Sequence, residues 1–382
     1  MSLFGLDFRK NKWETLMIFA VLSQSLWGLL QIMMMDVFNY DEDVANNLRV
    51  LLVATTMSYA IVYCANKAPR RFLLVYLATF SILLFTLVLF PENQKYLMLE
   101  AMKLTLPVVI PSFLCVTCVK DYDTIERILY VVSWFSVIVA MIYAVQLFSG
   151  RYIFSKYSIS FSFTLLLPTL VLISHKTLLS YIAALFLFVL IVFLGSRSAA
   201  IVIVIYAYIE ILFNKKNMVT VAIVSFVAVV SLPILIGYFE QYGVSSRTLS
   251  ILQSEEGLVG HLSHRDEIYD LCISKIQQNP IMGIGLYGDR LFLGGSTSHN
   301  VILELLLDFG VFGGSGVILY LFFYFIHTFL KSSHSRKVYF MRYFLAVMIP
   351  LMVSGSYLKD YNLGLFLGIC YLINKERKNQ VI

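Results

Sequence analysis

The chain has 382 residues, of which 59% are hydrophobic and only 14% charged, and its mean hydropathy is +0.80. Soluble domains carry about 25% charged residues, so this composition excludes a soluble globular protein and indicates an integral membrane protein. The formal net charge of +6 comes mostly from basic residues that flank apolar runs, so it gives no support to nucleic-acid binding.

Apolar runs of about 20 residues, the length that a helix needs to cross a bilayer, recur along the chain. Backbone groups must be satisfied inside lipid, and a barrel would show alternating segments of about 10 residues instead. The sequence therefore predicts an all-α, polytopic transmembrane helical bundle. The expected spans, twelve in all, are residues 13–35, 48–65, 72–90, 98–119, 128–148, 157–174, 177–195, 198–213, 218–238, 300–330, 338–355 and 361–374.

Basic residues predict the orientation, because cytoplasmic loops carry an excess of Lys and Arg. With the N-terminus inside, alternation holds through all the spans, and residues 36–47 form an acidic outer loop. The apolar run after Lys12 is too long for a cleavable signal and is interpreted as a signal anchor. The inner segments hold Arg9, Lys10, Lys12, Lys67, Arg70, Arg71, Lys120, Arg127, Lys176, Lys215, Lys216, Lys331, Arg336, Lys337, Arg342, Lys375, Arg377 and Lys378.

Three segments follow from this pattern. Residues 1–238 hold nine spans, residues 239–297 form one long outward-facing loop with short helices, and residues 298–382 hold three spans and a cytoplasmic C-terminus. A connection as long as 239–297 exceeds what a helix–helix link needs, and such loops are usually functional.

A helix over 264–278 is predicted inside this loop, bounded by a capping box that starts at Ser263 and by Pro280. Arg265 then lies in the first turn, where free N–H groups favour anions and a guanidinium adds a fork for phosphate oxygens. The alternative is a surface arginine paired with the acidic residues that follow it.

Arg197, in Gly195-Ser196-Arg197-Ser198, interrupts two apolar runs at the expected outer boundary of the membrane. A guanidinium is costly there, and snorkelling to the headgroups is one explanation. Small neighbours also leave room for a ligand, and both interpretations stay open.

Ser298-His299-Asn300 closes the long polar segment. A neutral imidazole can accept a proton from a hydroxyl, so His299 is a candidate base, and the alternative is a histidine that anchors a helix at the interface. Asn300 could orient His299 or bind a sugar hydroxyl.

Glu304 and Asp308 lie one turn apart on a helix face that must avoid lipid. Either could orient a base or pair with Arg265 or Arg290. The predicted substrate-binding residues are Asn300, Arg247, Arg290 and Glu304.

Several patterns are interpreted as packing or turns. Gly283-x-Gly285-x-x-Gly288 lacks a preceding strand and is expected to be a turn. The glycine pairs Gly310-xxx-Gly314 and Gly364-xxx-Gly368 are interpreted as close helix packing.

The remaining polar residues predict no metal or disulfide site. His261 and His264 have no partners for zinc, and the CxxC of Cys115 and Cys118 lies in an apolar span. Glu100 and Lys103 could form an intramembrane pair.

The residues together resemble a known family. The pair His299-Asn300 is followed after nine residues by Gly310 and after two more by Gly313. This spacing is similar to the pattern of bacterial O-antigen ligases and of the related O-antigen and capsule polymerases. The upstream Arg197 and Arg265 resemble arginine motifs of that family.

The resemblance implies a C-type, metal-independent glycosyltransferase that needs no cofactor and uses saccharides linked to undecaprenyl diphosphate. His299, Arg265 and Arg197 would be its catalytic residues, facing outward from a bacterial cytoplasmic membrane. A chain-length regulator and a flippase of the same pathway are implied partners.

Two outcomes share this chemistry. A polymerase extends the chain on the next lipid-linked repeat, whereas a ligase moves the chain to lipid A-core. The run Leu303–Gly310 looks like the polymerase version, so polymerase is the main prediction. A transporter or flippase is the alternative from another class, although no repeat symmetry supports it.

Overall fold

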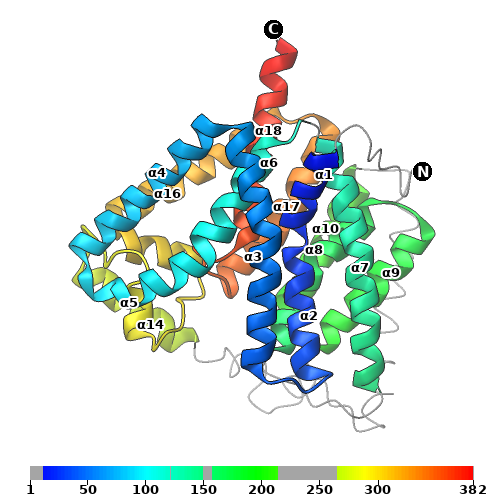
Figure 1. The fold of residues 1–382 in the computed structure, drawn as a ribbon, viewed down its shortest axis with the longest axis horizontal. Coiled ribbons are helices and arrows are strands. Elements are labelled where there is room, and N and C mark those ends of the chain that lie inside the picture. The colour runs from blue at the N-terminus through cyan, green and yellow to red at the C-terminus, as the bar shows by residue number, and fades with distance from the viewer. Residues whose placement is uncertain (1–11, 121, 149–156, 214–264, 382) are drawn as a thin grey trace. The chain divides into compact units, whose positions relative to one another are not determined.

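The computed structural model describes residues 12–120, 122–148, 157–213 and 265–381. These residues form helices joined by short connections, and no strand occurs among them (Figure 1). The predicted all-α class is therefore confirmed for this part of the chain.

Each predicted span that falls in these residues coincides with helical structure, and the span 218–238 lies outside them. The segment Pro91–Cys118 is continuous and is made of η2 (Pro91–Asn93), α5 (Gln94–Tyr96), η3 (Leu97–Val109) and α6 (Ile110–Cys118). The other described elements are α1 (Lys12–Leu22), α2 (Gln24–Asp36), α3 (Glu42–Lys67), α4 (Pro69–Leu89), α7 (Tyr122–Phe148), α8 (Ser158–Ser174), α9 (Leu178–Phe193), α10 (Arg197–Phe213), α14 (Arg265–Gln278), α15 (Asp289–Phe292), α16 (Val301–Lys331), α17 (His334–Val353) and α18 (Tyr361–Val381).

Length and composition qualify five of the described helical segments as membrane spans: α3, α4, Pro91–Cys118, α7 and α16. The pair α1 and α2, bent by 42°, makes a sixth if it forms one span. The apolar helices α8 and α9 are shorter. The chain is thus an integral membrane protein, while the count of twelve spans stays a prediction.

The chain divides into two compact units. The first comprises Met1–Thr56, Asp121–His261 and Met341–Ala346, and the second comprises Met57–Lys120, Leu262–Phe340 and Val347–Ile382. Within the first unit, α8 packs against α7, α9 and α10. The fully buried Arg342 forms an ion pair there with Glu126, which also accepts hydrogen bonds from Tyr122 and Tyr343.

The second unit carries the described part of the long loop. The predicted helix over 264–278 is observed as α14 (Arg265–Gln278), which packs against α16. The close-packing interpretation of Gly364-xxx-Gly368 is confirmed, because a Cβ on either glycine would collide with η3 or α6.

The membrane helix α16 is broken near its start. Gly310 has φ 70° and ψ 178°, a conformation that favours glycine. The carbonyl of Leu307, freed by the break, accepts from the Ile284 N–H at 2.7 Å. The Val311 N–H donates to the carbonyl of Pro280, also at 2.7 Å. Loop backbone thus replaces the helical hydrogen bonds lost at the break.

Two glycines allow this contact. A Cβ on Gly283 would collide with the backbone between Leu307 and Gly310, and a Cβ on Gly310 would collide with the backbone of Pro280 and its neighbour. The prediction that Gly310-xxx-Gly314 marks close packing of two helices is therefore wrong at Gly310. A loop, and not a helix, approaches there.

Candidate active site

Asn300 begins α16 as its N-cap. Its Oδ1 accepts from the N–H of Ile302 at 2.9 Å and of Leu303 at 3.3 Å. These are two of the N–H groups that a helix start leaves without partners. The observed contacts of Asn300 explain the start of the helix, and its predicted contact with a sugar hydroxyl stays a prediction.

His299 adopts the left-handed conformation, with φ 54°, and its side chain is half-buried. Its Nδ1 lies 3.2 Å from the carbonyl oxygen of Ser354 and 3.3 Å from Oγ1 of Thr297. Its Nε2 lies 3.3 Å from Oγ of Ser296, an exposed residue. The ring is therefore held on its Nδ1 side and open toward solvent on its Nε2 side.

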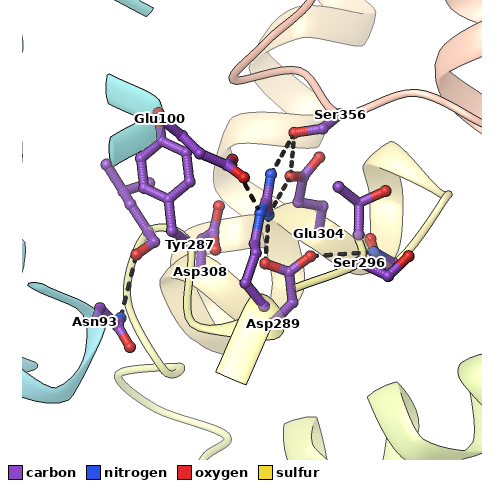
Figure 2. Close-up of polar contacts among 12 residues, drawn as sticks. Asn93, Glu100, Tyr287, Asp289, Ser296, Glu304, Asp308 and Ser356 are labelled. Carbon is purple, nitrogen blue, oxygen red and sulfur yellow. Dashed lines mark hydrogen bonds and ion pairs between the residues drawn. The ribbon is translucent and has the colours of Figure 1, made fainter. Parts of the chain in front are cut away.

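A cluster of charged side chains surrounds Arg290, which is fully buried. Figure 2 shows three side chains of this cluster, Glu100, Asp289 and Glu304, together with Ser356. The guanidinium of Arg290 is paired with Asp289, with Glu304 at 2.9 Å and with Glu100 at 3.4 Å, and it donates to Ser356 Oγ at 2.9 Å. Burial alone would lower the pKa of Arg290, but the carboxylates raise it, so the side chain stays a cation.

The cluster extends through the segment that joins α17 to α18. The Tyr357 N–H donates to Glu304 at 3.1 Å, its hydroxyl donates to Asp308 at 2.6 Å, and Lys359 pairs with Glu100 at 2.8 Å. Burial and the neighbouring carboxylates raise the pKa of Tyr357 well above its ordinary value. The hydroxyl therefore stays protonated and donates.

These contacts decide two alternatives that the sequence left open. Glu304 pairs with Arg290, and both Glu304 and Asp308 are buried, as expected for a face that avoids lipid. Within the described residues, Glu100 pairs with Lys359 and Arg290, whereas no ion pair with Lys103 is found.

The cluster also reaches the turn that bears His299. Asp289 Oδ2 accepts from the Ser298 N–H at 3.1 Å, and Ser298 Oγ donates to the Asn300 carbonyl at 3.2 Å. His299, Asn300, Arg290 and its carboxylates therefore form one connected region of the second unit.

Two of the remaining predicted residues begin helices. Arg265 opens α14 in the second unit and Arg197 opens α10 in the first, and both side chains are half-buried. Arg247 lies outside the described residues. The convergence of Arg197 and Arg265 on His299 stays a prediction, as does substrate binding by Arg290 and Glu304, whose observed contacts are within the protein.

Sequence reasoning missed Asp289, Ser354 and Ser356. The acid–base dipeptide Asp289-Arg290 in an uncharged stretch was a usable signal, because such charges need partners when buried. No spacing rule connects the two serines to a turn more than 50 residues upstream. Among the described residues, no group of three or more His, Cys, Asp or Glu side chains is arranged to hold a metal ion.

The described residues define a helical integral membrane protein with a histidine-bearing turn at the start of a broken apolar helix. Residues 182–318 match the family model described as O-antigen ligase, a range that includes Arg197, Arg265, His299 and the break at Gly310. The resemblance to the O-antigen ligase and polymerase family is thereby confirmed over this range. Comparisons with curated proteins and with solved structures gave no significant match.

Proposed function

We propose that the protein is a glycosyltransferase of the bacterial cytoplasmic membrane that moves a saccharide from a lipid-linked diphosphate onto a hydroxyl acceptor at the outer face. The observation that carries this proposal is the O-antigen ligase match, which spans the turn with His299 and the break in α16. The lipid tail of such a donor stays in the bilayer while its diphosphate and sugar emerge at the surface.

The two arginines act on the leaving group. Negative charge grows on the diphosphate as its bond to the sugar breaks, so Arg197 and Arg265 stabilise the transition state more than the ground state. Arg265 stands in the first turn of α14, where backbone N–H groups add to the attraction for phosphate. Loss of such a donor typically costs about 10²–10³ in rate.

His299 acts on the acceptor. Its open Nε2 side receives the proton of the attacking hydroxyl, which is worth about 10²–10⁴ in rate when a base is well placed. The proton leaves as the new glycosidic bond forms and as the diphosphate departs with the electrons of the old one. The residues in these roles need no metal or cofactor.

The acceptor defines two candidate reactions. We propose the next lipid-linked repeat unit as acceptor, which makes the protein a polysaccharide polymerase. Transfer to lipid A-core is the second candidate, and the description of the matching family model, O-antigen ligase, favours it.

A deletion strain separates the two reactions. Loss of a polymerase leaves a single repeat attached to lipid A-core, whereas loss of a ligase leaves long chains unattached on the carrier lipid. Wild-type gene supplied in trans restores the pattern in either case. Purified protein that elongates or transfers lipid-linked repeats in detergent, with no second compartment, supports the enzyme and excludes a transporter. Purified, folded protein that does neither contradicts the proposed enzyme.

A further inference from the structure

The charged cluster around Arg290 has an arrangement that a purely structural role does not require. We propose, on the basis of the function above, that Asp289 and Arg290 are positioning residues that fix the tautomer and the orientation of His299. They hold the imidazole with its proton on Nδ1 and its free lone pair on Nε2, directed at the acceptor hydroxyl.

The tautomer follows from the partner of Nδ1. A backbone carbonyl only accepts hydrogen bonds, so the contact of Nδ1 with the Ser354 carbonyl at 3.2 Å requires the proton on Nδ1. Nε2 of the neutral ring is then an acceptor, as a base needs. The exposed Ser296 hydroxyl, 3.3 Å from Nε2, occupies the direction from which an acceptor hydroxyl approaches.

The cluster around Arg290 holds both partners of the contact between His299 Nδ1 and the Ser354 carbonyl. On the histidine side, Asp289 accepts from the Ser298 N–H, which fixes the residue directly before His299. On the carbonyl side, Ser356 donates to Glu304 at 2.5 Å and accepts from Arg290 at 2.9 Å, which fixes the segment that begins at Ser354.

Arg290 joins these two anchors, because it pairs with Asp289 and with Glu304 at once. A shift of either anchor would move the imidazole relative to the carbonyl. Misplacement of a reacting group by about 1 Å can cost on the order of 10² in rate.

The conformation of His299 adds to this argument. A left-handed φ of 54° in a residue other than glycine is uncommon and strained, so it persists only where neighbours enforce it. Buried ion pairs are often no better for stability than apolar residues of similar size. Positioning is the role that accounts for both features.

Nitrogen NMR of the full-length protein, labelled with ¹⁵N-histidine in lipid nanodiscs, tests the tautomer without any assay of activity. The His299 signal is assigned by its loss in His299→Gln. We expect the neutral ring to be protonated on Nδ1 in the wild type and to become a mixture of tautomers in Asp289→Asn, because the amide cannot accept from both Ser298 and Arg290.

The matched control is Asp270→Asn on the exposed side of α14, which should leave the His299 signal unchanged. A wild-type ring protonated on Nε2, or an Asp289→Asn spectrum identical to the wild type, would overturn the proposal.

Kinetics separate positioning from a role in binding or folding. Asp289→Asn should lower kcat by about 10²-fold with little change in KM, and it should cause no further loss in a His299→Gln background. Equal losses in both backgrounds would overturn the inference. A His299→Gln variant with wild-type kcat would instead contradict the proposed function, while the NMR result would still report on the tautomer.

Discussion

Arg290 lies in an environment unlike that of an ordinary surface arginine. Its side chain is fully buried among Asp289, Glu304 and Glu100. Replacement by methionine keeps much of the volume but removes the cation, so uncompensated buried carboxylates remain. We expect Arg290→Met to lower the free energy of unfolding by about 3–5 kcal/mol, measured by denaturation in detergent.

The double variant Arg290→Met with Glu304→Met provides the control. It removes one of the carboxylates left unpaired and should recover part of the lost stability, because the stability changes caused by substitutions at contacting residues do not simply add. A single variant as stable as the wild type would show that the cluster is not buried as described.

Residue-scale prediction succeeded where the chemistry was local. Glu304 and Asp308 were expected on a protected face because charges avoid lipid, and both are buried. Asn300 was predicted as a substrate ligand, yet its oxygen caps α16, a role that its position before an apolar run also indicated. Apart from its neighbour Asp289, the partners of Arg290 come from three other segments, which no local pattern connects.

At the scale of elements, the break in α16 predicts that a side chain at Gly310 lowers stability. Gly310→Ala places a Cβ against the backbone near Pro280 at a positive φ, so we expect a loss of stability of about 2–4 kcal/mol and a fall in activity. Gly316→Ala in the same helix is the control, since a Cβ there meets open space. Thermal unfolding of both variants, side by side, measures the difference. Equal midpoints of thermal unfolding would contradict the close contact between the loop and the break at Gly310.

The docking of α14 on α16 is tested by Cys272. Burial, with Asp289 and Glu304 nearby, raises the pKa of this fully buried thiol to about 12. Only on the order of 10⁻⁴ of it is thiolate at pH 8, so a variant with Cys272 as its single cysteine should resist maleimide until unfolded. Cys272→Ala with Ser274→Cys, which is exposed on the same helix, should react quickly. Fast reaction of Cys272 would mean that α14 is not docked.

Element boundaries were predictable where the signals lie in the element itself. The capping pattern and the proline stop gave 264–278 for a helix observed at Arg265–Gln278. The break at Gly310 could not be predicted in this way, because its cause is the backbone of residues 280–284, about 30 residues upstream. A glycine spacing that suits helix contacts also suits the close approach of a loop.

At the scale of the whole molecule, the predicted orientation assigns faces to two exposed positions. Ser274 of α14 is expected outside and Ser335 of α17 inside. In cysteine-free protein with one cysteine added, Ser274→Cys should react with a membrane-impermeant maleimide in intact cells. Ser335→Cys should react only after permeabilisation. The reverse pattern would contradict an outward-facing site.

The number of spans and the meeting of distant residues were less accessible to sequence reasoning. The apolar helices α8 and α9 have 17 and 16 residues, short of the length that crosses a bilayer without help, so hydropathy alone does not decide their path. Arg197 and Arg265 belong to different units, and no periodicity in the sequence connects them.

The rate of sugar transfer by purified His299→Gln protein, with lipid-linked repeat units as substrate, tests the account most directly. Glutamine keeps a polar group near the Nε2 position but is not a base. We predict that kcat falls by about 10²–10⁴ while KM and the thermal midpoint stay near their wild-type values. Turnover at the wild-type rate by the folded variant would contradict the account.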